Sequence, residues 1–557
     1  MSAFPVAPET LAHEVTNQVP PLVDYNAFTQ DTVLMAALDR EGGSWATDAA
    51  RDLGATVGSQ PVQEAARLAN RHTPELKTHD RTGNRIDFVE YHPAYHDLMR
   101  HAFGAGVHSF AWTHDRAGAH VARAALSFLW NQAENGTACP TGMNYSAIPL
   151  LAKTPSIARD WVPALNATHY DSRPLPIAQK TGATIGMTLT EKQGGSDLRA
   201  NTTRAQALGR AEPGEPYELT GHKWFCSAPM CDAFYTLAYA DNGPTCFLVP
   251  RSLPDGRRNR FFIQRLKDKL GNRSNASSEV EFDRTLAWAL CEEGRGIPAA
   301  VEMIHLTRLD FAIGSAGLMR QALTQALHHT AHRRAFQRTL VDQPLMRNVL
   351  ADLAIESEAH TVLAFRLARA CDAARRGDAE AALFERIATP VAKYWACKRA
   401  APFVHEALEC HGGNGFVEEH VMPRLYREAP LNGIWEGSGN VIVLDVLRAI
   451  RRDRPALAAL FGDLRRARGG DRRLDAFADR LETDLGDTND METRGRALVE
   501  RLALSLQGAL LVQHAPHAVA DTFCASRLDG YWGHAFGTLP SGFDLRTIID
   551  RARVAAS

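Results

Sequence analysis

The spacing of apolar residues changes twice along this chain, and these changes restrict its fold more than any other feature. Before about residue 180, apolar residues recur every three or four positions and predict helices such as Pro93–Phe103 and Ala119–Glu134. Residues 181–290 instead contain short β-rich runs separated by Gly, Pro and Asn. The helical spacing returns in long stretches from about residue 297 to 450. This order predicts an α+β protein with separate helical and β domains.

The β-rich runs have the length and spacing of strands in a small barrel or sandwich. They are Tyr217–Ser227, Phe234–Ala240, Thr245–Pro250, Phe261–Leu266 and Ser278–Phe282. The later helical stretches are long enough to pack as an antiparallel four-helix bundle. The longest of them are Leu306–Ala331, Pro344–Arg376 and Ala379–His411.

Four domains are predicted in the 557 residues, of which 45% are hydrophobic, enough to form several cores. They are an N-terminal helical domain at 1–180, a middle β domain at 181–290, a helix bundle at 291–450 and a C-terminal helical extension at 451–557. The first domain begins with an extended, proline-bearing arm, Met1–Asn26. The extension contains one clear helical pattern, Gly495–Val512.

Composition argues against several classes of protein. The net charge of −2 provides no global attraction to nucleic acid or anionic membranes, so such binding would need a local basic patch. The nine cysteines form no CxxC pair and are expected to be reduced thiols. His328, His329 and His332 lie at helical spacing without carboxylate partners, so we assign no metal site. Neither a leader pattern nor a membrane-spanning run is present, and we expect a cytoplasmic, unprocessed protein.

Two motifs lie at the start of the β-rich region. The run Leu189–Asp197 reads Leu-Thr-Glu-Lys-Gln-Gly-Gly-Ser-Asp, and Gly221–Ser227 reads Gly-His-Lys-Trp-Phe-Cys-Ser. Alone, the first could be an ordinary glycine-rich turn, and the second could be a strand whose aromatic pair lies in a core. Small hydroxyl residues beside glycines also allow backbone N–H groups to approach a flavin or a pyrophosphate closely.

Further motifs follow in order along the chain. They are Lys267–Gly271 with Arg273 and Ser274, Arg308 at a helix, Arg333-Arg-Ala-Phe336, Cys410–Phe416, Arg424–Glu428 and Ile434–Asn440. Together with the two earlier runs, they resemble the signature elements of the acyl-CoA dehydrogenase superfamily at the expected separations. The resemblance implies the fold of that family and FAD as cofactor.

The resemblance also implies cofactor-binding residues. They are Thr190, Ser196, Trp224, Phe225, Ser227, Arg333, Phe336, Gln343, Gly412, Gly413, Ser438 and Asn440. Arg333 and Phe336 belong to an element that, in this family, reaches the FAD pyrophosphate of a neighbouring subunit, a task that suits the planar guanidinium fork. Two positions depart from the family pattern: Gln337 stands where Gly is usual, and Glu409 where Gln is common.

Glu436 is the predicted catalytic base. Dehydrogenation of an acyl thioester requires removal of a weakly acidic α-proton while a hydride leaves the β-carbon, and a desolvated carboxylate gains basicity for this purpose. Some family members place the base just before the arginine that matches Arg308, but Thr307 occupies that position here and cannot serve. A simpler interpretation of Glu436 is a residue that merely caps or charges a helix start.

The C-terminal extension begins with a surplus of arginine. Residues 448–473 contain nine Arg and three Asp, which could form a phosphate-binding stripe. Over residues 451–557 the surplus almost disappears, with sixteen Arg, no Lys and fifteen Asp plus Glu, so a solvated helix face is the plainer interpretation. The candidate DNA-binding residues are Arg448, Arg451, Arg452, Arg454, Arg465 and Arg466.

The extension favours one branch of the family. Together with Asn17–Leu22, Glu191–Asp197, Lys267–Ser277 and Trp435–Leu447, it resembles the AidB-like alkylation-response branch. Members of that branch are tetrameric flavoproteins that bind double-stranded DNA without strong sequence preference, oxidise acyl-CoA poorly and protect DNA during alkylation stress. The resemblance therefore implies a homotetramer with weak dehydrogenase activity. A metabolic dehydrogenase for short or branched acyl chains, with no DNA role, is the alternative.

Overall fold

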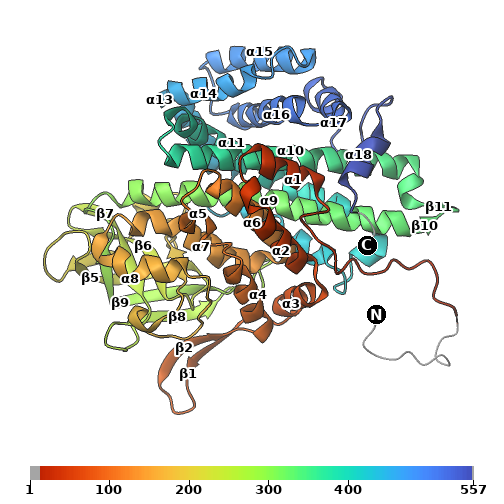
Figure 1. Cartoon of the computed structure of the whole chain (residues 1–557). Helices are drawn as coiled ribbons and strands as arrows, with labels where there is room; N and C mark the ends of the chain where they lie inside the picture. The colour runs from red at the N-terminus through yellow and green to blue at the C-terminus, as the bar shows by residue number, and fades with distance from the viewer. Residues whose placement is uncertain (1–12, 555–557) are drawn as a thin grey trace.

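The computed structural model describes residues 13–554, which form an α+β protein of stacked helical and β layers (Figure 1). Long helices cross the middle of the molecule. The β domain lies against one end of these helices, and the C-terminal helices lie above them in this view. This arrangement confirms the predicted fold class. Each layer follows from the apolar spacing of its own segment.

The N-terminal region is mainly helical, as predicted. Its helices are α1 (Thr32–Arg40), α2 (Thr47–Gly58), α3 (Gln60–Arg71), α4 (Pro93–Gly104), α5 (Phe110–Thr113), α6 (Ala119–Ala133), α7 (Asn135–Leu151) and α8 (Pro155–Asn166). Every residue of α6 is buried, because this helix packs against both α2 and the first long helix of the bundle. Residues 13–26 of the predicted arm contain no helix or strand, and residues 1–12 of it lie outside the described range.

The sequence prediction missed one feature of this region. The strands β1 (Glu75–His79) and β2 (Arg85–Glu90) form an antiparallel hairpin that projects from the body of the protein (Figure 1). The Asp80 carboxylate closes the turn by accepting hydrogen bonds from the backbone N–H groups of Thr82 and Asn84. Both strands are short and largely exposed, so their alternation was too weak to stand out among helices.

The β domain is a small barrel with two further strands. Its strands are β3 (Ile185–Thr188), β4 (Arg204–Ala207), β5 (Pro216–Ser227), β6 (Ala233–Ala240), β7 (Gly243–Pro250), β8 (Phe261–Leu266) and β9 (Ser277–Ala289). Pairing runs β6-β4-β5-β9-β7, and β7 pairs again with β6, which closes the ring. The last strand was predicted to end at Phe282, but it continues to Ala289 because its second half pairs with the start of β5.

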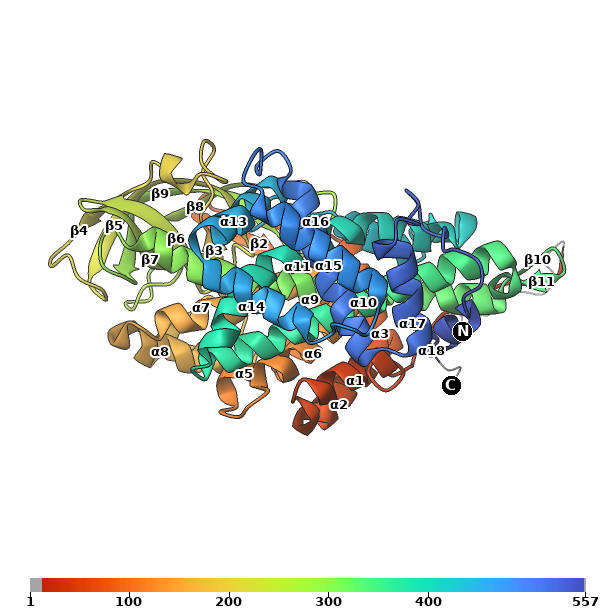
Figure 2. The same ribbon diagram turned by 90° about the horizontal axis from the view of Figure 1, so that it is seen from above.

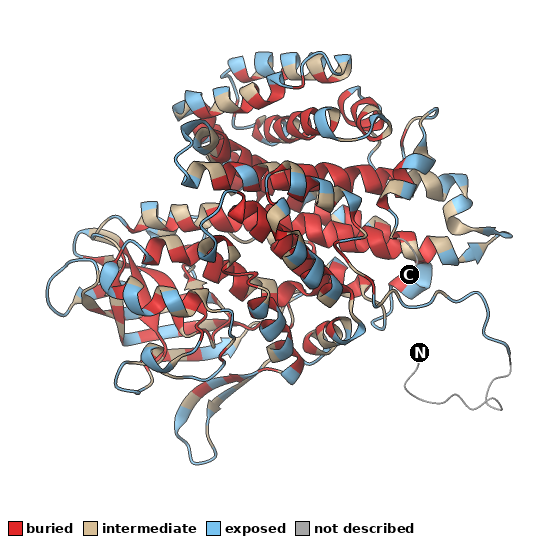
Figure 3. Ribbon diagram, in the orientation of Figure 1, coloured by how far each residue is buried: buried red, intermediate tan, exposed pale blue. Residues whose placement is uncertain are grey.

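Three long helices form the centre of the molecule. They are α9 (Gly296–His332), α10 (Pro344–Arg375) and α11 (Ala379–Glu409), and all three pack against one another. The shorter α13 (Gly439–Arg452) packs on α11, and α12 (Met422–Glu428) lies between these two in sequence. Figure 3 shows nearly continuous burial along the middle helices, as expected for a bundle covered on several sides.

The C-terminal extension lies across this bundle and is not a detached unit (Figure 2). It contains α14 (Arg454–Arg465), α15 (Arg472–Gly486), α16 (Gly495–His514), α17 (His517–Phe523) and α18 (Leu545–Ala552). Helix α14 packs on α11, α18 packs on α10, and α16 contacts both long helices. No helix within residues 13–554 combines the length and apolar character needed to cross a membrane.

A buried charge network fixes the extension to the bundle. Arg527 follows α17, and its guanidinium pairs with Asp352 and, at 2.9 Å, with Glu356, both on α10. Arg399 on α11 pairs with the same Glu356 at 2.8 Å. Burial raises the pKa of the Glu356 carboxyl, but the Arg399 and Arg527 guanidiniums outweigh this and hold the pKa well below its usual range. The Glu356 carboxylate therefore stays charged at neutral pH.

Replacing Arg527 with Met should decrease the free energy of unfolding by about 3–5 kcal/mol, because it leaves two carboxylates buried beside too few cations. Chemical denaturation would measure this loss. Arg472→Ala provides the control, since Arg472 is exposed in the same extension and its loss should change stability by less than about 0.5 kcal/mol. Equal stability of the two variants would show that the network does not fix the extension.

Candidate active site

The loop that carries Glu436 is fixed by two cations from the bundle. The Arg308 Nε of α9 donates to the Glu436 carbonyl oxygen at 3.1 Å. The Lys393 Nζ of α11 donates to the carbonyl oxygens of Trp435 at 3.1 Å and Gly437 at 2.6 Å. These contacts hold Glu436 in the left-handed region, with φ at +53°, a conformation that costs a non-glycine residue about 1–3 kcal/mol.

The Trp435 ring adds a third contact between this loop and the bundle. It stacks on Phe311 of α9 with ring centroids 4.9 Å apart and planes 7° from parallel. Its indole N–H donates to Asn432 Oδ1 at 2.9 Å, and the Asn432 amide donates in turn to the Ser315 hydroxyl at 3.1 Å. The position of the Glu436 backbone is therefore determined by α9 and α11 together.

The Glu436 carboxyl is basic for a glutamate. It accepts no hydrogen bond from any residue of the described range, and burial raises its pKa to about 7, against the opposing effects of Arg308 and Lys393. At neutral pH this carboxyl can therefore either hold or release a proton, as a general base must. A group that only capped a helix would be expected to have hydrogen-bond partners and an ordinary pKa.

A second wall of the site is formed by the end of β5. The pairing of β5 with β9 shifts register between Lys223 and Cys226, so Trp224 and Phe225 form a bulge. Bulges of this kind redirect side chains near functional sites. Phe225 is 48% exposed, and the Lys267 ammonium lies over both the Trp224 and Phe225 rings. The aromatic pair therefore faces outward and is not part of a core.

The segment around Thr190 is attached to this bulge. The Trp224 backbone N–H donates to the Thr190 carbonyl oxygen at 2.8 Å. Next to it, the Glu191 carboxylate pairs with Lys223 at 2.8 Å, and both side chains are fully buried. Apart from the buried Gly194, the following residues up to Asp197, including Ser196, are exposed. The buried ion pair fixes the glycine-rich turn to β5, and the hydroxyl and N–H groups of the turn remain accessible.

Two residues that the sequence did not single out connect the two walls. Burial raises the pKa of the Cys139 thiol of α7 to about 12, and both Ser227 and Glu436 lie near enough to shift this pKa. The Lys269 ammonium donates to the Ser277 hydroxyl at 3.0 Å and faces Cys139. Burial lowers the pKa of Lys269 to about 8. Ser227 at the end of β5 and Glu436 on its loop thus both lie near Cys139, and Thr190, Trp224 and Phe225 adjoin Ser227 along the same wall.

Other predicted residues lie far from this site, at the opposite end of the bundle. A small hairpin of β10 (Arg334–Ala335) and β11 (Arg338–Thr339) forms the tip of the bundle (Figure 1). Phe336 lies in the turn of this hairpin, and Arg333 and Gln343 flank the hairpin in sequence. Gly412 and Gly413 belong to the same end, because the adjacent His411 ring lies 4.7 Å from that of His329 near the end of α9. A single chain therefore does not bring these residues to Glu436.

The last two predicted cofactor residues begin α13. Ser438 is the N-terminal capping residue of this helix, but its exposed hydroxyl makes no capping hydrogen bond. Asn440 Oδ1 accepts from Arg496 Nε of α16 at 2.9 Å. Contact with the extension therefore occupies Asn440, and Ser438 remains open. Within residues 13–554, no cluster of three or more His, Cys, Asp or Glu side chains could hold a metal ion.

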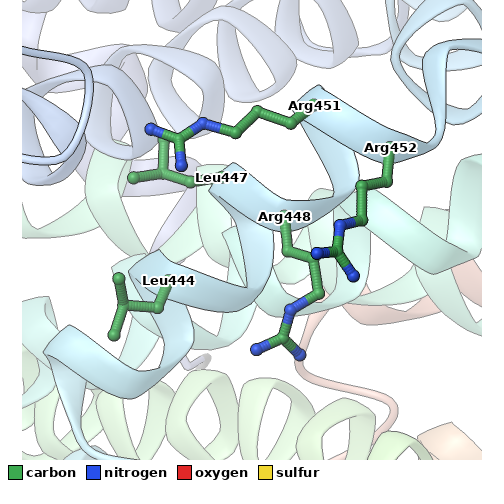
Figure 4. A pocket seen from close by; sticks show the side chains of 5 residues that line it. All are labelled: Leu444, Leu447, Arg448, Arg451 and Arg452. Atoms are coloured by element: carbon green, nitrogen blue, oxygen red, sulfur yellow. The ribbon is translucent and has the colours of Figure 1, made fainter.

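The candidate DNA-binding arginines form a stripe along α13 and α14. Arg448, Arg451 and Arg452 surround a surface hollow with Leu444 and Leu447, and Figure 4 shows Arg448 and Arg452 extending to one side of the helix. No salt bridge joins these three arginines to any residue between 13 and 554. Arg454 and Arg465 are likewise exposed and without a salt bridge in that range.

Ion pairs reduce the arginine surplus that the sequence suggested. Arg466 pairs with Asp463 at 2.7 Å and with Glu380 at 3.7 Å. Arg468 pairs with Asp479, and Arg473 pairs with Asp471 and Asp521. These three guanidiniums already have carboxylate partners. The exposed arginines of residues 448–473 that have no salt bridge in the described range are therefore Arg448, Arg451, Arg452, Arg454, Arg465 and, at the start of α15, Arg472.

Three family models match successive parts of the chain. Residues 17–172 match the adaptive response protein AidB N-terminal domain. Residues 186–285 match the acyl-CoA dehydrogenase middle domain, and residues 294–451 match the acyl-CoA dehydrogenase C-terminal domain. Together they cover well over half of the chain.

Individual relatives extend over nearly the whole length. The chain is 46% identical over 519 residues to the putative acyl-CoA dehydrogenase AidB of Escherichia coli K12, covering 93% of this chain and 94% of that protein. The crystal structure of Caenorhabditis elegans ACDH-11 in complex with C11-CoA has a TM-score of 0.82 and 25% identity, and covers 99% of this chain and 95% of that one.

A more distant neighbour shares the fold alone. The acyl-CoA dehydrogenase of Bacillus anthracis, whose structure was solved in complex with FAD, has a TM-score of 0.65 at 18% identity and covers 83% of this chain and 86% of that chain. The motif order, the layered fold and these relatives agree. The chain belongs to the acyl-CoA dehydrogenase family, in the branch that carries the AidB N-terminal domain.

Proposed function

We propose that this protein is an FAD-containing oxidoreductase of the alkylation-damage response that dehydrogenates acyl-CoA weakly and binds double-stranded DNA without sequence preference. The observation that carries the enzymatic part is the Glu436 carboxyl, which has a pKa of about 7 and lies beside an outward-facing wall of aromatic and hydroxyl groups. The arginine stripe on α13 and α14 carries the DNA part.

The wall formed by β5 and the glycine-rich turn fits a flavin. Phe225 and Trp224 offer apolar ring faces, and Thr190 and Ser227 offer hydroxyl groups beside them. The backbone N–H of Ser196 makes no hydrogen bond within residues 13–554, so the turn can donate to an acceptor such as a ring carbonyl or a phosphate. When bound here, FAD would supply the acceptor for the hydride that leaves the acyl β-carbon.

The far end of the bundle fits the phosphate and adenosine portion of the same cofactor, held between two copies of the chain. Arg333 has no salt bridge within the described range, and Phe336 is 93% exposed with φ at +49°. A Cβ added at Gly412 or Gly413 would meet nothing within 4 Å, so a ligand can approach the backbone there. Since these residues lie far from Glu436 in one chain, the proposal requires a partner copy and agrees with a homotetramer.

A CoA thioester is the proposed substrate class. The relative ACDH-11 was crystallised in complex with C11-CoA and matches this chain over 99% of its length. With the thioester bound, the Glu436 carboxylate would remove the α-proton, and Arg308 and Lys393 would keep the carboxylate in place through the backbone. Burial by the substrate would exclude water from the carboxylate and increase its basicity further.

Binding to DNA would depend on phosphate neutralisation. Arg448, Arg451, Arg452, Arg454 and Arg465 are exposed and without a salt bridge among residues 13–554, whereas Arg466 is already paired. Guanidinium groups that lack an internal carboxylate can bind phosphate without first breaking an ion pair. Contacts of this kind carry no sequence information, which agrees with non-specific binding.

The alternative is a metabolic dehydrogenase for short or branched acyl chains without a DNA role. The hydrogen bonds from Arg308 and Lys393 to the Glu436 loop favour this alternative, because that geometry suits full catalysis as well as weak catalysis. Steady-state oxidation of a panel of acyl-CoA thioesters separates the two. Turnover comparable to that of metabolic family members, with no duplex binding, would support the alternative. A flavin absorption spectrum titrated with duplex DNA and with acyl-CoA tests both parts together.

The substitution Glu436→Gln should decrease kcat by about 10²–10⁴-fold, because it removes the general base and keeps the side-chain shape. Single-turnover bleaching of the flavin absorption by an acyl-CoA would measure this. FAD content should be unchanged, since the Glu436 side chain makes no hydrogen bond in the described range. Glu419→Gln, an exposed glutamate before α12, is the matched control. Activity retained in Glu436→Gln would assign the base elsewhere.

The pH dependence of kcat/KM should have an acidic limb near pH 7. The pKa of Glu436 is raised to about 7, so the carboxylate becomes protonated as pH falls through that value, and activity should then decrease about tenfold per unit. FAD absorbance recorded over the same range would show whether the cofactor stays bound. A limb near the ordinary glutamate value would mean that the carboxyl is not desolvated in solution.

Replacing Arg448, Arg451 and Arg452 with Ala should weaken duplex binding and decrease the slope of log K against log salt by about 2.7, corresponding to three lost phosphate contacts. Fluorescence anisotropy with two unrelated duplexes would measure slope and sequence preference together. Arg468→Ala is the control, because Arg468 is already paired with Asp479. An unchanged slope in the triple variant would exclude this stripe as the DNA site.

A further inference from the structure

The extended arm before α1 follows the second half of α9 toward the tip of the bundle. The Tyr25 hydroxyl donates to Gln321 Oε1 of α9 at 3.0 Å. Farther along the helix, His328 Nε2 donates to the Pro20 carbonyl oxygen at 2.8 Å. Because the arm numbers decrease as the α9 numbers increase, the arm runs antiparallel to the helix and reaches the β10–β11 hairpin.

Asn17 joins the arm to this hairpin through both polar atoms of its side chain. Its Nδ2 donates to the Arg334 carbonyl oxygen at 2.9 Å, and its Oδ1 accepts from the Arg334 backbone N–H at 2.9 Å. The side-chain amide thus pairs with β10 in the way that the backbone of a further strand would. Asn17 has φ at +54°, a left-handed conformation that asparagine adopts more readily than most residues.

The backbone of Asn17 also orients the side chain of Arg333, the residue that follows α9. Nη1 of the Arg333 guanidinium donates to the Asn17 carbonyl oxygen. The Nε and Nη2 groups make no hydrogen bond within residues 13–554. A guanidinium held at one nitrogen has fewer orientations, and its free N–H groups can still pair with two oxygens of one phosphate.

Positive charge is concentrated at the tip that the arm contacts. Arg333, Arg334 and Arg338 are close in sequence, and no salt bridge joins any of them to a residue of the described range. Asp342 is the only acidic residue between positions 310 and 352, and its carboxylate accepts a hydrogen bond from the Thr339 hydroxyl. The tip is therefore suited to an anionic ligand.

The hairpin that Asn17 contacts has a turn that is unfavourable by itself. Phe336 and Gln337 form this turn with φ at +49° and +66°, whereas turns of this kind favour Gly and Asn. The Arg334 guanidinium supports the turn by donating to the Gln337 carbonyl oxygen at 3.0 Å. Since an isolated two-stranded hairpin is only marginally stable, contacts from the arm help to keep the tip in one conformation.

We propose that Asn17 is a positioning residue for the phosphate-bearing half of the cofactor and acts through Arg333. The arm fixes β10 and the Arg333 guanidinium before the ligand arrives, so a diphosphate ester such as that of FAD binds without the cost of ordering the tip. This inference rests on the proposed function, which places the phosphate and adenosine portion of FAD at the tip of the bundle.

The preference for FAD over FMN tests this inference, because FMN lacks the adenosine and one of the two phosphates. The holoprotein would be equilibrated with a mixture of both flavins, and chromatography of the bound flavin would give the ratio. Asn17→Gly removes the side-chain amide and tolerates the left-handed backbone, and it should decrease the FAD-to-FMN ratio about tenfold, the effect of one or two lost hydrogen bonds. Gln18→Ala is the matched control and should keep the wild-type ratio, because Gln18 is exposed and its side chain makes no hydrogen bond in the described range.

A double variant shows whether the arm acts through Arg333. Arg333→Ala should lower the FAD-to-FMN ratio by itself, and adding Asn17→Gly should then have little further effect, because both changes remove one unit. The inference would be wrong if Asn17→Gly kept the wild-type ratio while Arg333→Ala lowered it, or if Asn17→Gly weakened both flavins equally. A wild-type ratio in Arg333→Ala would instead exclude the tip as a cofactor site, and this inference with it.

Discussion

The ion pair between Arg308 and Asp445 is the contact on which the arrangement of this protein most depends. Arg308 Nη1 of α9 donates to Asp445 Oδ2 of α13 at 2.6 Å, and its Nε donates to the Glu436 carbonyl oxygen. Arg386 of α11 pairs with the same Asp445 at 3.0 Å. One largely buried carboxylate thus connects two bundle helices, the loop of the proposed base and the helix that carries three free arginines. Because removal of one partner from such a group leaves a charge uncompensated, this cluster fixes the relative positions of all four elements.

Much of the fold could be predicted from the sequence, because most of its elements are long and buried on at least one side. Burial makes the helical spacing of α10 and α11 uninterrupted, so their limits were predicted within two residues. The sequence did not predict the first turns of α9 or the second half of β9. Tertiary contacts, and not local spacing, determine where α9 begins and where β9 ends. The β1–β2 hairpin was missed for a related reason, since its strands are stabilised mainly by pairing with each other.

The candidate site was less predictable than the fold. Motifs identified Glu436, Thr190 and Ser227, because each lies in a short run with a recognisable pattern. Lys393 and Cys139 were missed, since each is a single residue inside a helix and becomes relevant only when α11 and α7 are folded against the loop. The count of charges in the sequence likewise overestimated the number of arginines in the stripe that lack a carboxylate partner. One of the two carboxylates that pair with Arg466 belongs to Glu380, which is distant in sequence and adjacent only in the fold.

The two proposed activities share one structural element. Helix α13 begins three residues after Glu436 and ends at Arg452, and a helix of 14 residues is about 21 Å long. A duplex bound to the free arginines would therefore lie within one helix length of the base. Asp445 fixes that helix to the bundle between the two sites, so a movement of α13 caused by DNA would act on the same ion pair that positions the Glu436 loop. Since energetic coupling between two ligands is reciprocal, any effect of DNA on acyl-CoA affinity must be matched by an equal effect of acyl-CoA on DNA affinity.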